Sequence, residues 1–470
     1  MAFNEIGFLF VFFPAVVLLH AITPTMILKN ILLLLASLVF FAWGTPEYLL
    51  LMVLIILYNY FSGLQISHCL EDDNESGARR TLIVSVVMNL LLLGFFKYWG
   101  FFLDNVNALL GTSIPVRKLP MPIGVSFFTF SVLSYLYDVY RDRAPAARNI
   151  LNFSLYVTFF PKLVSGPIVQ YNAMEAQLRQ RKISGIRFGR GVRLFLIGLA
   201  KKVLLSNTLG TTFYAVSAIS GEEVATVTAW IGALSYSLML YFDFSGYSDM
   251  AIGLGEMFGF DFGKNFDYPY MATSITDFWR RWHISLGAWF RDYVYIPLGG
   301  SREGTGITIR NLCVVWLLTG IWHGANWTFL MWGVYYGILL ILEKFVFKKL
   351  VDVLPKFIGR IFTVFLVIIG WVFFFSPSIG SAFMWLGRMF GIGGPGFMDA
   401  TASYYLSGSW IVLLIAAVAA YPIGTKLGNN VYRRGNTPVY LSVIWFAALL
   451  VLCIAGMMTS TYTTFLYFQF

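Results

Sequence analysis

Long apolar runs follow one another along the whole chain and constrain its fold more than any other feature. The hydrocarbon core of a bilayer is about 30 Å thick, so a helix needs about 20 apolar residues to cross it. Most of the runs approach that length, and no long polar domain separates them. The sequence therefore predicts an all-α integral membrane protein with about a dozen transmembrane and re-entrant helices. The runs cover residues 6–23, 26–43, 47–65, 81–102, 121–140, 151–166, 191–210, 226–244, 309–323, 327–343, 359–375, 409–424 and 438–456.

The composition agrees with a chain embedded in lipid. Hydrophobic residues make up 58% of the sequence and charged residues only 12%, about half the charged fraction of a typical soluble protein. The net charge of +10 is better explained by basic cytoplasmic loops than by nucleic acid, and we expect no nucleic-acid partner. Three cysteines give no disulfide framework. The first apolar run has no basic segment before it, so we interpret it as a first helix and not as a cleaved signal.

Basic residues assign the loops to the two faces of the membrane. The loops 141–150 and 171–190 are both basic, although a single apolar run lies between them. We therefore predict that residues 151–170 enter the membrane and return to the same side, because Pro161 and the glycine and proline after it interrupt a helix. With this assignment, the C-terminal end lies on the outer face and the Gly-rich stretch 376–408 is an outer loop.

An ionisable side chain interrupts one of the apolar runs. Residues 322–327 read Trp-His-Gly-Ala-Asn-Trp and follow an apolar helix expected over 314–321. From Arg310 to His323 this helix would cover only about 20 Å, less than the thickness of the hydrocarbon core. We therefore predict that His323 lies within the membrane, at the top of a helical hairpin that returns through residues 327–342. A buried imidazole at such a depth usually transfers protons or binds a ligand.

A second dense motif, residues 277–287, interleaves tryptophans with arginines. Rings at headgroup level and guanidinium groups in water are typical of an interfacial lipid anchor. The alternative is a cytoplasmic mouth, in which arginines bind phosphates and aromatic rings flank a nucleotide or pantetheine arm. His283 on this side and the buried His323 suggest a two-histidine site. The candidate donor-binding residues are Trp279, Arg280, Arg281, Trp282 and, beyond the motif, Arg291.

Five motifs together resemble the membrane-bound O-acyltransferase family, and the resemblance runs along the whole chain. The branch it resembles is the bacterial one typified by alginate O-acetylase, and teichoic-acid D-alanyl transferase is a nearer cousin than the eukaryotic sterol and lipid enzymes. The combination of motifs is specific, although no single motif is. The family fold implies helices around a central tunnel. The motifs are residues 122–127, 160–167 and 243–249, Arg280-Arg281-Trp282-His283, and Trp322-His323-Gly324.

The resemblance implies a reaction as well as a fold. Family members pass an acyl group from a cytoplasmic thioester to a hydroxyl at or beyond the membrane. The catalytic role falls on His323, with His283 as the second family histidine. A buried imidazole can accept the proton of a hydroxyl, which is a poor nucleophile at neutral pH. Trp322 and Trp327 would exclude water that hydrolyses the thioester, and Asn326 is a candidate oxyanion donor.

The printed sequence ends with Phe-Leu-Tyr-Phe-Gln-Phe at residues 465–470. One interpretation is an aromatic belt where the last helix leaves the membrane. Bacterial relatives share a Phe-x-Tyr-x-x-Phe ending, in which the tyrosine resembles an acyl relay. Our hypothesis is that Tyr467 enters the outer mouth, loses its proton to His323 and leaves as an acyl-tyrosine ester. An outer-face partner of the SGNH acetyltransferase type would then collect the acyl group.

Other polar residues within apolar runs have structural interpretations. Lys201 and Lys202 could extend to the interface or pair with Asp243 or Asp249, and we predict structural pairing. No set of Asp, Glu, His or Cys residues has the spacing of metal ligands, and no phosphate-binding glycine loop occurs in the sequence. We expect no bound metal or cofactor.

These observations predict a multi-pass acetyltransferase of the bacterial plasma membrane, surrounded by lipid. Residues 1–470 would form one domain, with a catalytic core at about 120–345 and C-terminal helices and tail at 359–470. The donor would be acetyl-CoA or the phosphopantetheine thioester of a carrier protein, and the acceptor an extracytoplasmic polysaccharide. Two alternatives stay open. One is D-alanyl or other acyl transfer to a cell-wall polymer, and the other is a polysaccharide transporter, although no repeated halves are detectable.

Overall fold

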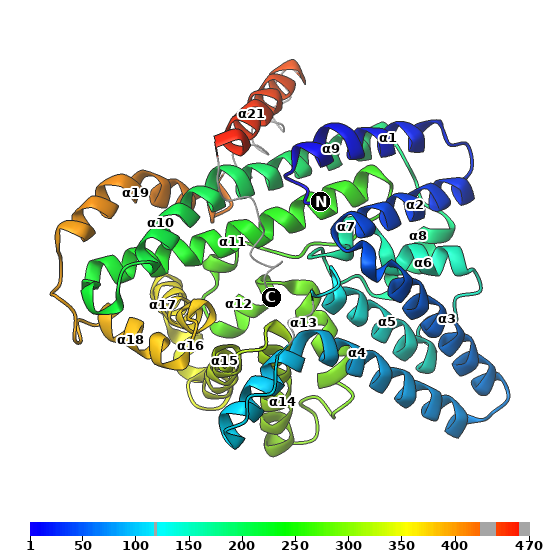
Figure 1. Cartoon of the computed structure of the whole chain (residues 1–470), viewed down its shortest axis with the longest axis horizontal. Coiled ribbons are helices and arrows are strands. Elements are labelled where there is room, and N and C mark those ends of the chain that lie inside the picture. Colours follow the sequence, from blue (N-terminus) through cyan, green and yellow to red (C-terminus); the bar gives the residue numbers. More distant parts are fainter. Residues whose placement is uncertain (117–119, 424–438, 460–470) are drawn as a thin grey trace. The chain divides into compact units, whose positions relative to one another are not determined.

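The structure, a computed structural model, describes residues 1–116, 120–423 and 439–459, and their regular secondary structure is helical (Figure 1). Within these ranges, eight helices are long and apolar enough to cross a membrane. The chain is therefore an all-α, multi-pass membrane protein, as the sequence predicts. The eight candidate spans are Met26–Gly44, Pro46–Glu71, Glu75–Leu110, Thr305–His323, Trp327–Phe345, Lys356–Phe375, Ala400–Ala419 and Tyr440–Thr459.

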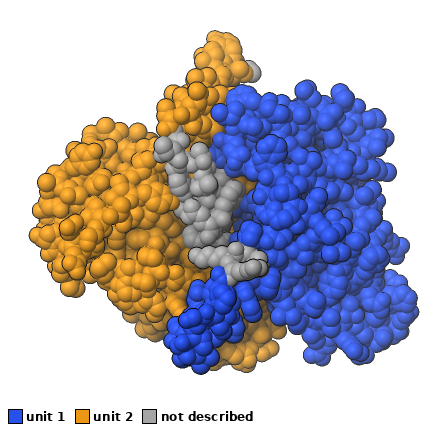
Figure 2. Space-filling view, in the orientation of Figure 1, with its two compact units in different colours: residues 1–195, 250–263 blue, residues 196–249, 264–470 orange. Residues whose placement is uncertain are grey.

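The chain divides into two compact units, which have different colours in Figure 2. Two of the three divisions fall within helices, α9 (Gly185–Ala200) and α11 (Thr226–Met257), and the third follows residue 263 in a loop. The single domain that the sequence suggests stays a prediction. Unit 1 contains residues 1–195 and 250–263, and unit 2 contains residues 196–249 and 264–470.

In unit 1, consecutive helices pack side by side, α3 against α4 and α4 against α5. The start of α5 touches the backbone at the end of α7. Gly124 has a positive φ of +72°, and a Cβ there would lie 2.2 Å from the carbonyl oxygen of Leu163, so only glycine fits. The elements of unit 1 before α9 are η1 (Phe8–Phe12), α1 (Phe13–Ile22), α2 (Met26–Gly44), η2 (Pro46–Tyr48), α3 (Leu49–Glu71), α4 (Glu75–Leu110), α5 (Val125–Tyr140), α6 (Ile150–Thr158), α7 (Phe160–Leu163) and α8 (Tyr171–Arg179).

The segment from α6 to α8 begins and ends at one place in unit 1. Asn30, near the start of α2, donates hydrogen bonds to Asn152 Oδ1 in α6 at 2.9 Å and to the Leu178 carbonyl in α8 at 2.8 Å. Between them, α6 ends at Thr158, and α7 has only four residues with Pro161 in its first turn. A segment that crossed the membrane could not bring both its ends to one residue of α2. The two ends of the segment therefore meet at one place, as the predicted re-entry requires, and its entry into the membrane stays a prediction.

Unit 2 contains the remaining helices. Two of its elements are π-helical turns, η3 after α9 and η6 after α13, and such turns are frequent at functional sites. The elements after α9, apart from α11, are η3 (Lys201–Ser206), α10 (Asn207–Ser217), η4 (Gly221–Glu223), η5 (Pro269–Met271), α12 (Ile275–Arg281), α13 (Ile284–Phe290), η6 (Arg291–Tyr295), α14 (Thr305–His323), α15 (Trp327–Phe345), α16 (Lys348–Val353), α17 (Lys356–Phe375), α18 (Ile379–Met389), α19 (Ala400–Ala419) and α21 (Val439–Thr459).

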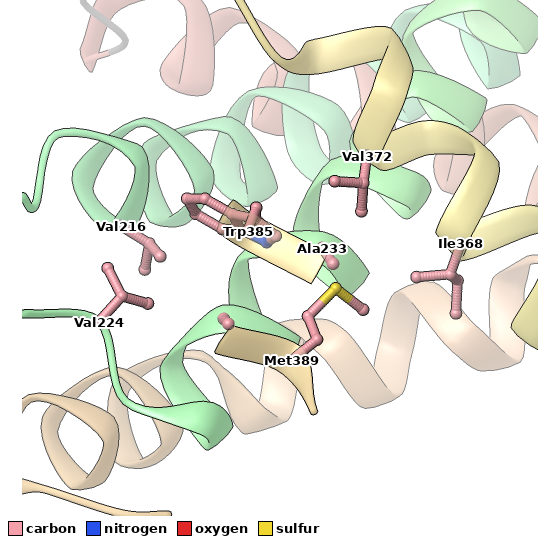
Figure 3. Packing of buried hydrophobic residues seen from close by; sticks show 8 residues of the cluster. Val216, Val224, Ala233, Ile368, Val372, Trp385 and Met389 are labelled. Carbon is pink, nitrogen blue, oxygen red and sulfur yellow. The ribbon is translucent and has the colours of Figure 1, made fainter. Parts of the chain in front are cut away.

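One apolar core of unit 2 lies among α10, α11, α17 and α18 (Figure 3). The stretch 376–408, predicted as an outer loop, contains α18 and the start of α19, so the prediction of a loop is wrong for residues 379–389 and 400–408. Ser378 and Ser381 form a capping box at its start, and its buried apolar residues recur at helical spacing. The core residues are Val216, Val224, Ala229, Ala233, Ile368, Val372, Trp385 and Met389.

The helices α14 and α15 form the predicted hairpin. They approach each other closely at Gly320, where a Cβ would lie only 2.6 Å from the carbonyl oxygen of Phe329. The small glycine therefore permits this approach. The first helix of the hairpin is longer than predicted, however. It begins at Thr305, and its 19 residues cover about 28 Å. The expectation of a short helix that stops midway is wrong, and His323 instead ends a helix of nearly full span length.

Candidate active site

Two short helices, α12 and α13, position His283 in unit 2. Ser274 caps the start of α12 by accepting from the Asp277 N–H, and the Glu343 carboxylate accepts from two more N–H groups of that turn at 2.6 and 3.0 Å. The helix ends at Arg281. His283 then takes a left-handed conformation, with φ +45°, before α13 begins. A residue with a side chain adopts this conformation at a cost of about 1 kcal/mol or more, so its surroundings must hold it there.

Asn265, which is fully buried, holds the His283 ring and the start of α13. Its Oδ1 accepts hydrogen bonds from the Ser285 N–H at 3.1 Å and hydroxyl at 2.9 Å, and the backbone N–H fixes the orientation of the amide. The same oxygen lies 3.2 Å from His283 Nδ1, so Nδ1 carries the proton and Nε2 the acceptor lone pair. Asn265 Nδ2 donates to Ser248 Oγ at 2.9 Å, which anchors the arrangement to α11.

His283 is held as a neutral ring. The residue is 2% exposed, and its ring meets the Phe244 ring edge-on at 4.6 Å between centroids. It lies outside the eight candidate spans. Burial, and secondly the nearby His323, lower the pKa of the His283 imidazole well below its ordinary value. At neutral pH the ring is therefore uncharged and can accept a hydrogen bond at Nε2.

His323 ends α14 and is 3% exposed. Its Nδ1 lies 2.7 Å from the carbonyl oxygen of Thr319, one turn earlier. Since a carbonyl only accepts, Nδ1–H is the donor and Nε2 is the proton acceptor, the same tautomer as in His283. The carbonyl groups of the last turn of α14 carry partial negative charge, which stabilises an imidazolium at this end. His323 is therefore placed to take a proton and to hold it during a reaction.

Aromatic rings surround His323. The Trp332 ring is 4.7 Å away between centroids, and those of Trp322 and Phe374 are 5.0 and 5.4 Å away. Trp322 also lies 6.3 Å from His283, so one indole is next to both histidines. These rings exclude water, and polar groups among them act at a low dielectric constant.

The tryptophans of the second motif point into unit 2. Trp282 is 3% exposed and lies 4.9 Å from the Trp371 ring. Trp279 meets the Trp316 ring edge-on at 4.8 Å, and its indole nitrogen is buried. The interpretation of these two rings as interfacial lipid anchors is therefore wrong. Their role in donor binding stays a prediction.

The arginines near this motif differ in their partners. Arg281 Nε donates to the Asp277 carboxylate at 2.8 Å, and Arg291 binds Asp292 through Nε and Nη2 at 2.7 and 3.0 Å. Arg280 and Arg291 are both exposed, but Arg280 forms no ion pair among the described residues, which leaves its guanidinium available to a phosphate. Within the described ranges, no group of three His, Cys, Asp or Glu side chains is arranged to hold a metal ion.

The other predicted site residues have different surroundings. Asn326 caps α15: its Oδ1 accepts from the Thr328 N–H at 3.1 Å, and its Nδ2 donates to the Pro377 carbonyl at 3.0 Å. These bonds give its amide a structural role and do not support an oxyanion donor. Trp327 is 51% exposed and so shields little of the site. Tyr467 lies outside the described residues, and its relay role stays a prediction.

The two lysines of η3 pair with α11. Lys202 lies 2.5 Å from Asp243, with both side chains at most 1% exposed, and Lys201 lies 2.6 Å from Asp249 nearer the surface. The predicted structural pairing is confirmed. Asp243 directly precedes Phe244, whose ring packs against the site, so the buried pair fixes this part of α11.

Sequence reasoning identified both histidines but missed the residues that orient them. Asn265 reaches His283 across 18 residues, and no local pattern signals that contact. Thr319 could have been found, because it lies four residues before His323 and a histidine at a helix end can donate to that carbonyl.

This geometry defines a class: a multi-pass helical membrane protein in which two buried histidines, surrounded by aromatic rings, each present Nε2 as an acceptor. The model of the membrane-bound O-acyltransferase family matches residues 38–385. The chain belongs to this family and is an O-acyltransferase.

Relatives with assigned names match nearly the whole chain. A probable alginate O-acetylase of Azotobacter vinelandii is 40% identical over 433 residues, which cover 91% of this chain and 85% of the relative. A probable alginate O-acetylase of Pseudomonas putida is 37% identical over the full length of both chains. A peptidoglycan O-acetyltransferase of Helicobacter pylori is 36% identical over 429 residues, 84% of this chain and 80% of the relative.

Proposed function

We propose that this chain moves an acetyl group from a cytoplasmic thioester for the O-acetylation of an extracytoplasmic polysaccharide, with His323 as general base. The observation that carries the proposal is the 2.7 Å hydrogen bond from His323 Nδ1 to the Thr319 carbonyl, which makes Nε2 the proton acceptor inside a dry aromatic site. The names of the relatives, alginate and peptidoglycan O-acetylases, support acetyl as the group and a polysaccharide as the acceptor.

The reaction needs only one proton carrier. The acceptor hydroxyl oxygen attacks the thioester carbonyl carbon while its proton moves to His323 Nε2. The tetrahedral intermediate then collapses, the carbon–sulfur bond breaks, and the imidazolium returns the proton to the thiolate. The products are an ester and a thiol. General base catalysis of this kind contributes about 10²- to 10⁴-fold to a rate.

His283 is suited to a second role in the same step. Its neutral ring presents Nε2 beside Trp322, where it can accept a hydrogen bond from the reacting hydroxyl or the departing thiol. The strained backbone at His283 and its three-way link through Asn265 keep the ring in one orientation, which lowers the cost of positioning a substrate.

The donor and the outer steps complete the proposal. Free acetyl-CoA is the donor, and the exposed Arg280 binds its phosphates at the cytoplasmic face of the bacterial plasma membrane. Tyr467 receives the acetyl group as an ester, and an SGNH-type acetyltransferase on the outer face passes it to the polysaccharide. The location of Tyr467 within an aromatic tail supports its entry into an apolar mouth.

The test uses purified protein in nanodiscs with acetyl-CoA labelled on the acetyl group. Thiol release is followed over time, and intact mass and peptide mapping locate any label. We expect label on Tyr467 in the native protein and none in Tyr467→Phe. His323→Ala should reduce thiol release by about 10²- to 10⁴-fold.

His68→Ala is the matched control, because His68 is an exposed histidine paired with Asp72. It should retain full activity. Thiol release that persists in His323→Ala would overturn the assigned base. Turnover without label on Tyr467 would keep the enzyme and reject the relay, and turnover only with a carrier-protein thioester would replace the donor.

A further inference from the structure

A buried cation in unit 1 has only neutral hydrogen-bond acceptors. Arg181, in the loop between α8 and α9, is 8% exposed. Its Nε donates to the Phe258 carbonyl at 2.9 Å, its Nη1 donates to Asn30 Oδ1 at 2.6 Å, and its guanidinium lies 4.1 Å from the centre of the Phe260 ring. Among the ion pairs of the described residues, none involves Arg181. Burial lowers the pKa of Arg181 to about 10, as expected for a cation without a carboxylate beside it.

Two more basic side chains gather next to Arg181. Lys29 Nζ donates to the carbonyl oxygen of His20 at 2.8 Å. His20 is 4% exposed, and its ring meets the ring of Phe258 edge-on at 5.1 Å, the same residue whose carbonyl binds Arg181. The positive charges of Lys29 and Arg181 repel each other, and both disfavour protonation of the His20 ring. Three elements, α1, α2 and the loop after α8, therefore bring basic groups to one place.

Two buried nitrogens of this cluster have no hydrogen-bond partner in the part of the chain that the structure describes: Arg181 Nη2 and His20 Nε2. Leaving such a group unsatisfied is costly, and most buried polar atoms do have partners. A structural role explains Nε and Nη1 of Arg181, which join α2 to the 258–260 turn. A structural role does not explain why Arg181 Nη2 lacks a partner, nor why the positive charges of Arg181 and Lys29 lie close together. A bound anion would explain both observations.

We propose that Arg181, His20 and Lys29 form a binding site for a phosphate group at the cytoplasmic end of α1 and α2. The planar guanidinium matches the oxygens of phosphate, and a lysine adds a point charge. The loop that carries Arg181 belongs to the basic stretch 179–193, which the positive-inside rule assigns to the cytoplasm. Lys29 is half-buried and marks the side from which an anion reaches the cluster.

Two sources could supply this phosphate group: the headgroup of an anionic lipid, or a soluble phosphorylated molecule. The site does not depend on acyl transfer, because it is defined by binding alone. The experiment therefore measures binding on the full chain in nanodiscs. One arm compares phosphatidylcholine discs with discs that also contain phosphatidylglycerol. The other arm adds pyrophosphate to phosphatidylcholine discs at constant ionic strength.

The readouts are the thermal unfolding midpoint and, for lipid, native mass spectrometry of retained molecules. We expect at least one phosphate source to raise the unfolding midpoint of the native protein. The variants Arg181→Met and His20→Leu should each weaken this binding by at least about tenfold, because each removes one donor to a charged ligand. The matched controls Arg79→Met and His68→Leu change exposed residues of the same types and should keep it.

The outcomes separate the two sources. Stabilisation by phosphatidylglycerol alone identifies a lipid site, stabilisation by pyrophosphate alone identifies a soluble ligand, and stabilisation by both shows that the site accepts either. Stabilisation by neither overturns the proposal, and so does stabilisation that survives in His20→Leu. If Arg181→Met fails to fold, His20→Leu decides the question, because His20 Nε2 makes no hydrogen bond to the described residues that the substitution would break.

Discussion

The Lys202–Asp243 pair and the two histidines of unit 2 are buried to a similar degree but use their polar atoms in different ways. Lys202 and Asp243 neutralise each other at 2.5 Å. His283 and His323 each use Nδ1 to donate to an oxygen that fixes the ring, and each thereby makes Nε2 an acceptor. The comparison separates buried polarity that is satisfied within the fold from buried polarity that the fold orients for a partner.

The difference has an energetic side. A buried ion pair costs desolvation energy that its own attraction offsets only in good geometry, so losing one member leaves a costly isolated charge. A neutral histidine leaves no isolated charge behind when it is removed, so its loss should cost less folding free energy, while the chemistry it supports is lost. Variants at the two places should therefore separate stability from activity.

The largest expected effect is on activity at His323. His323→Ala should lower thioester turnover by about 10²- to 10⁴-fold, because the general base is removed. Its unfolding midpoint should fall less than that of a variant with an isolated buried charge, since the ring is neutral and its Nδ1 is held by the neutral Thr319 carbonyl. Turnover and thermal unfolding are measured on the same nanodisc preparation. A large loss of stability with little loss of specific activity would show that His323 has a structural role and not a catalytic one.

The opposite pattern is expected for Lys202. Lys202→Met leaves Asp243 as an isolated buried charge and should destabilise the protein by about 3–5 kcal/mol. The double variant Lys202→Met/Asp243→Leu removes both charges and should recover most of that loss. Chemical unfolding of the native protein, both single variants and the double variant gives the coupling energy. A double variant as unstable as the two losses added together would show that the pair is not a unit.

The sequence was sufficient to predict the parts of the fold that rest on local composition. The apolar runs predict the spans, and the basic loops on both sides of residues 151–170 predict the re-entrant segment. Asn30 contacts both ends of that segment. The Trp-His motif gave His323, and charges inside an apolar helix gave the Lys202–Asp243 pairing. In each of these cases the physical signal lies within a few consecutive residues.

Other parts could not be predicted, because they depend on contacts between distant residues. The start of α14 at Thr305 lies in a stretch without an apolar pattern. The helix α18 needs α11 and α17 as a surface for its apolar residues. Asn265 is one polar residue in a loop, and only folding brings it to His283 and Ser248. Orientation of a site is thus harder to predict than the residues that form it.

A smaller effect on activity is expected at Asn265, because this residue only orients the His283 ring. Asn265→Ala should reduce turnover by about 10- to 100-fold at saturating donor, as losses of groups that orient a site residue typically do. The KM for acetyl-CoA should change little. Asn265→Asp keeps an oxygen acceptor for His283 and Ser285 and should recover part of the rate. Equal losses in both variants would show that His283 does not need this acceptor.

The smallest effects are expected at two neighbouring arginines, Arg280 and Arg281. They too contrast a polar group that is bound within the fold with one that is available to a ligand. Arg281 is bound to Asp277 at 2.8 Å, while Arg280 is exposed. Arg280→Gln should raise the KM for acetyl-CoA by about 2- to 5-fold, the size of one exposed charge interaction, and leave the unfolding midpoint unchanged. Arg281→Gln should lower the unfolding midpoint slightly and leave KM unchanged. If KM responded to Arg281→Gln instead, Arg281 would be the arginine that binds the donor, although it is already bound to Asp277. An ion pair within the fold would then no longer indicate that an arginine has only a structural role.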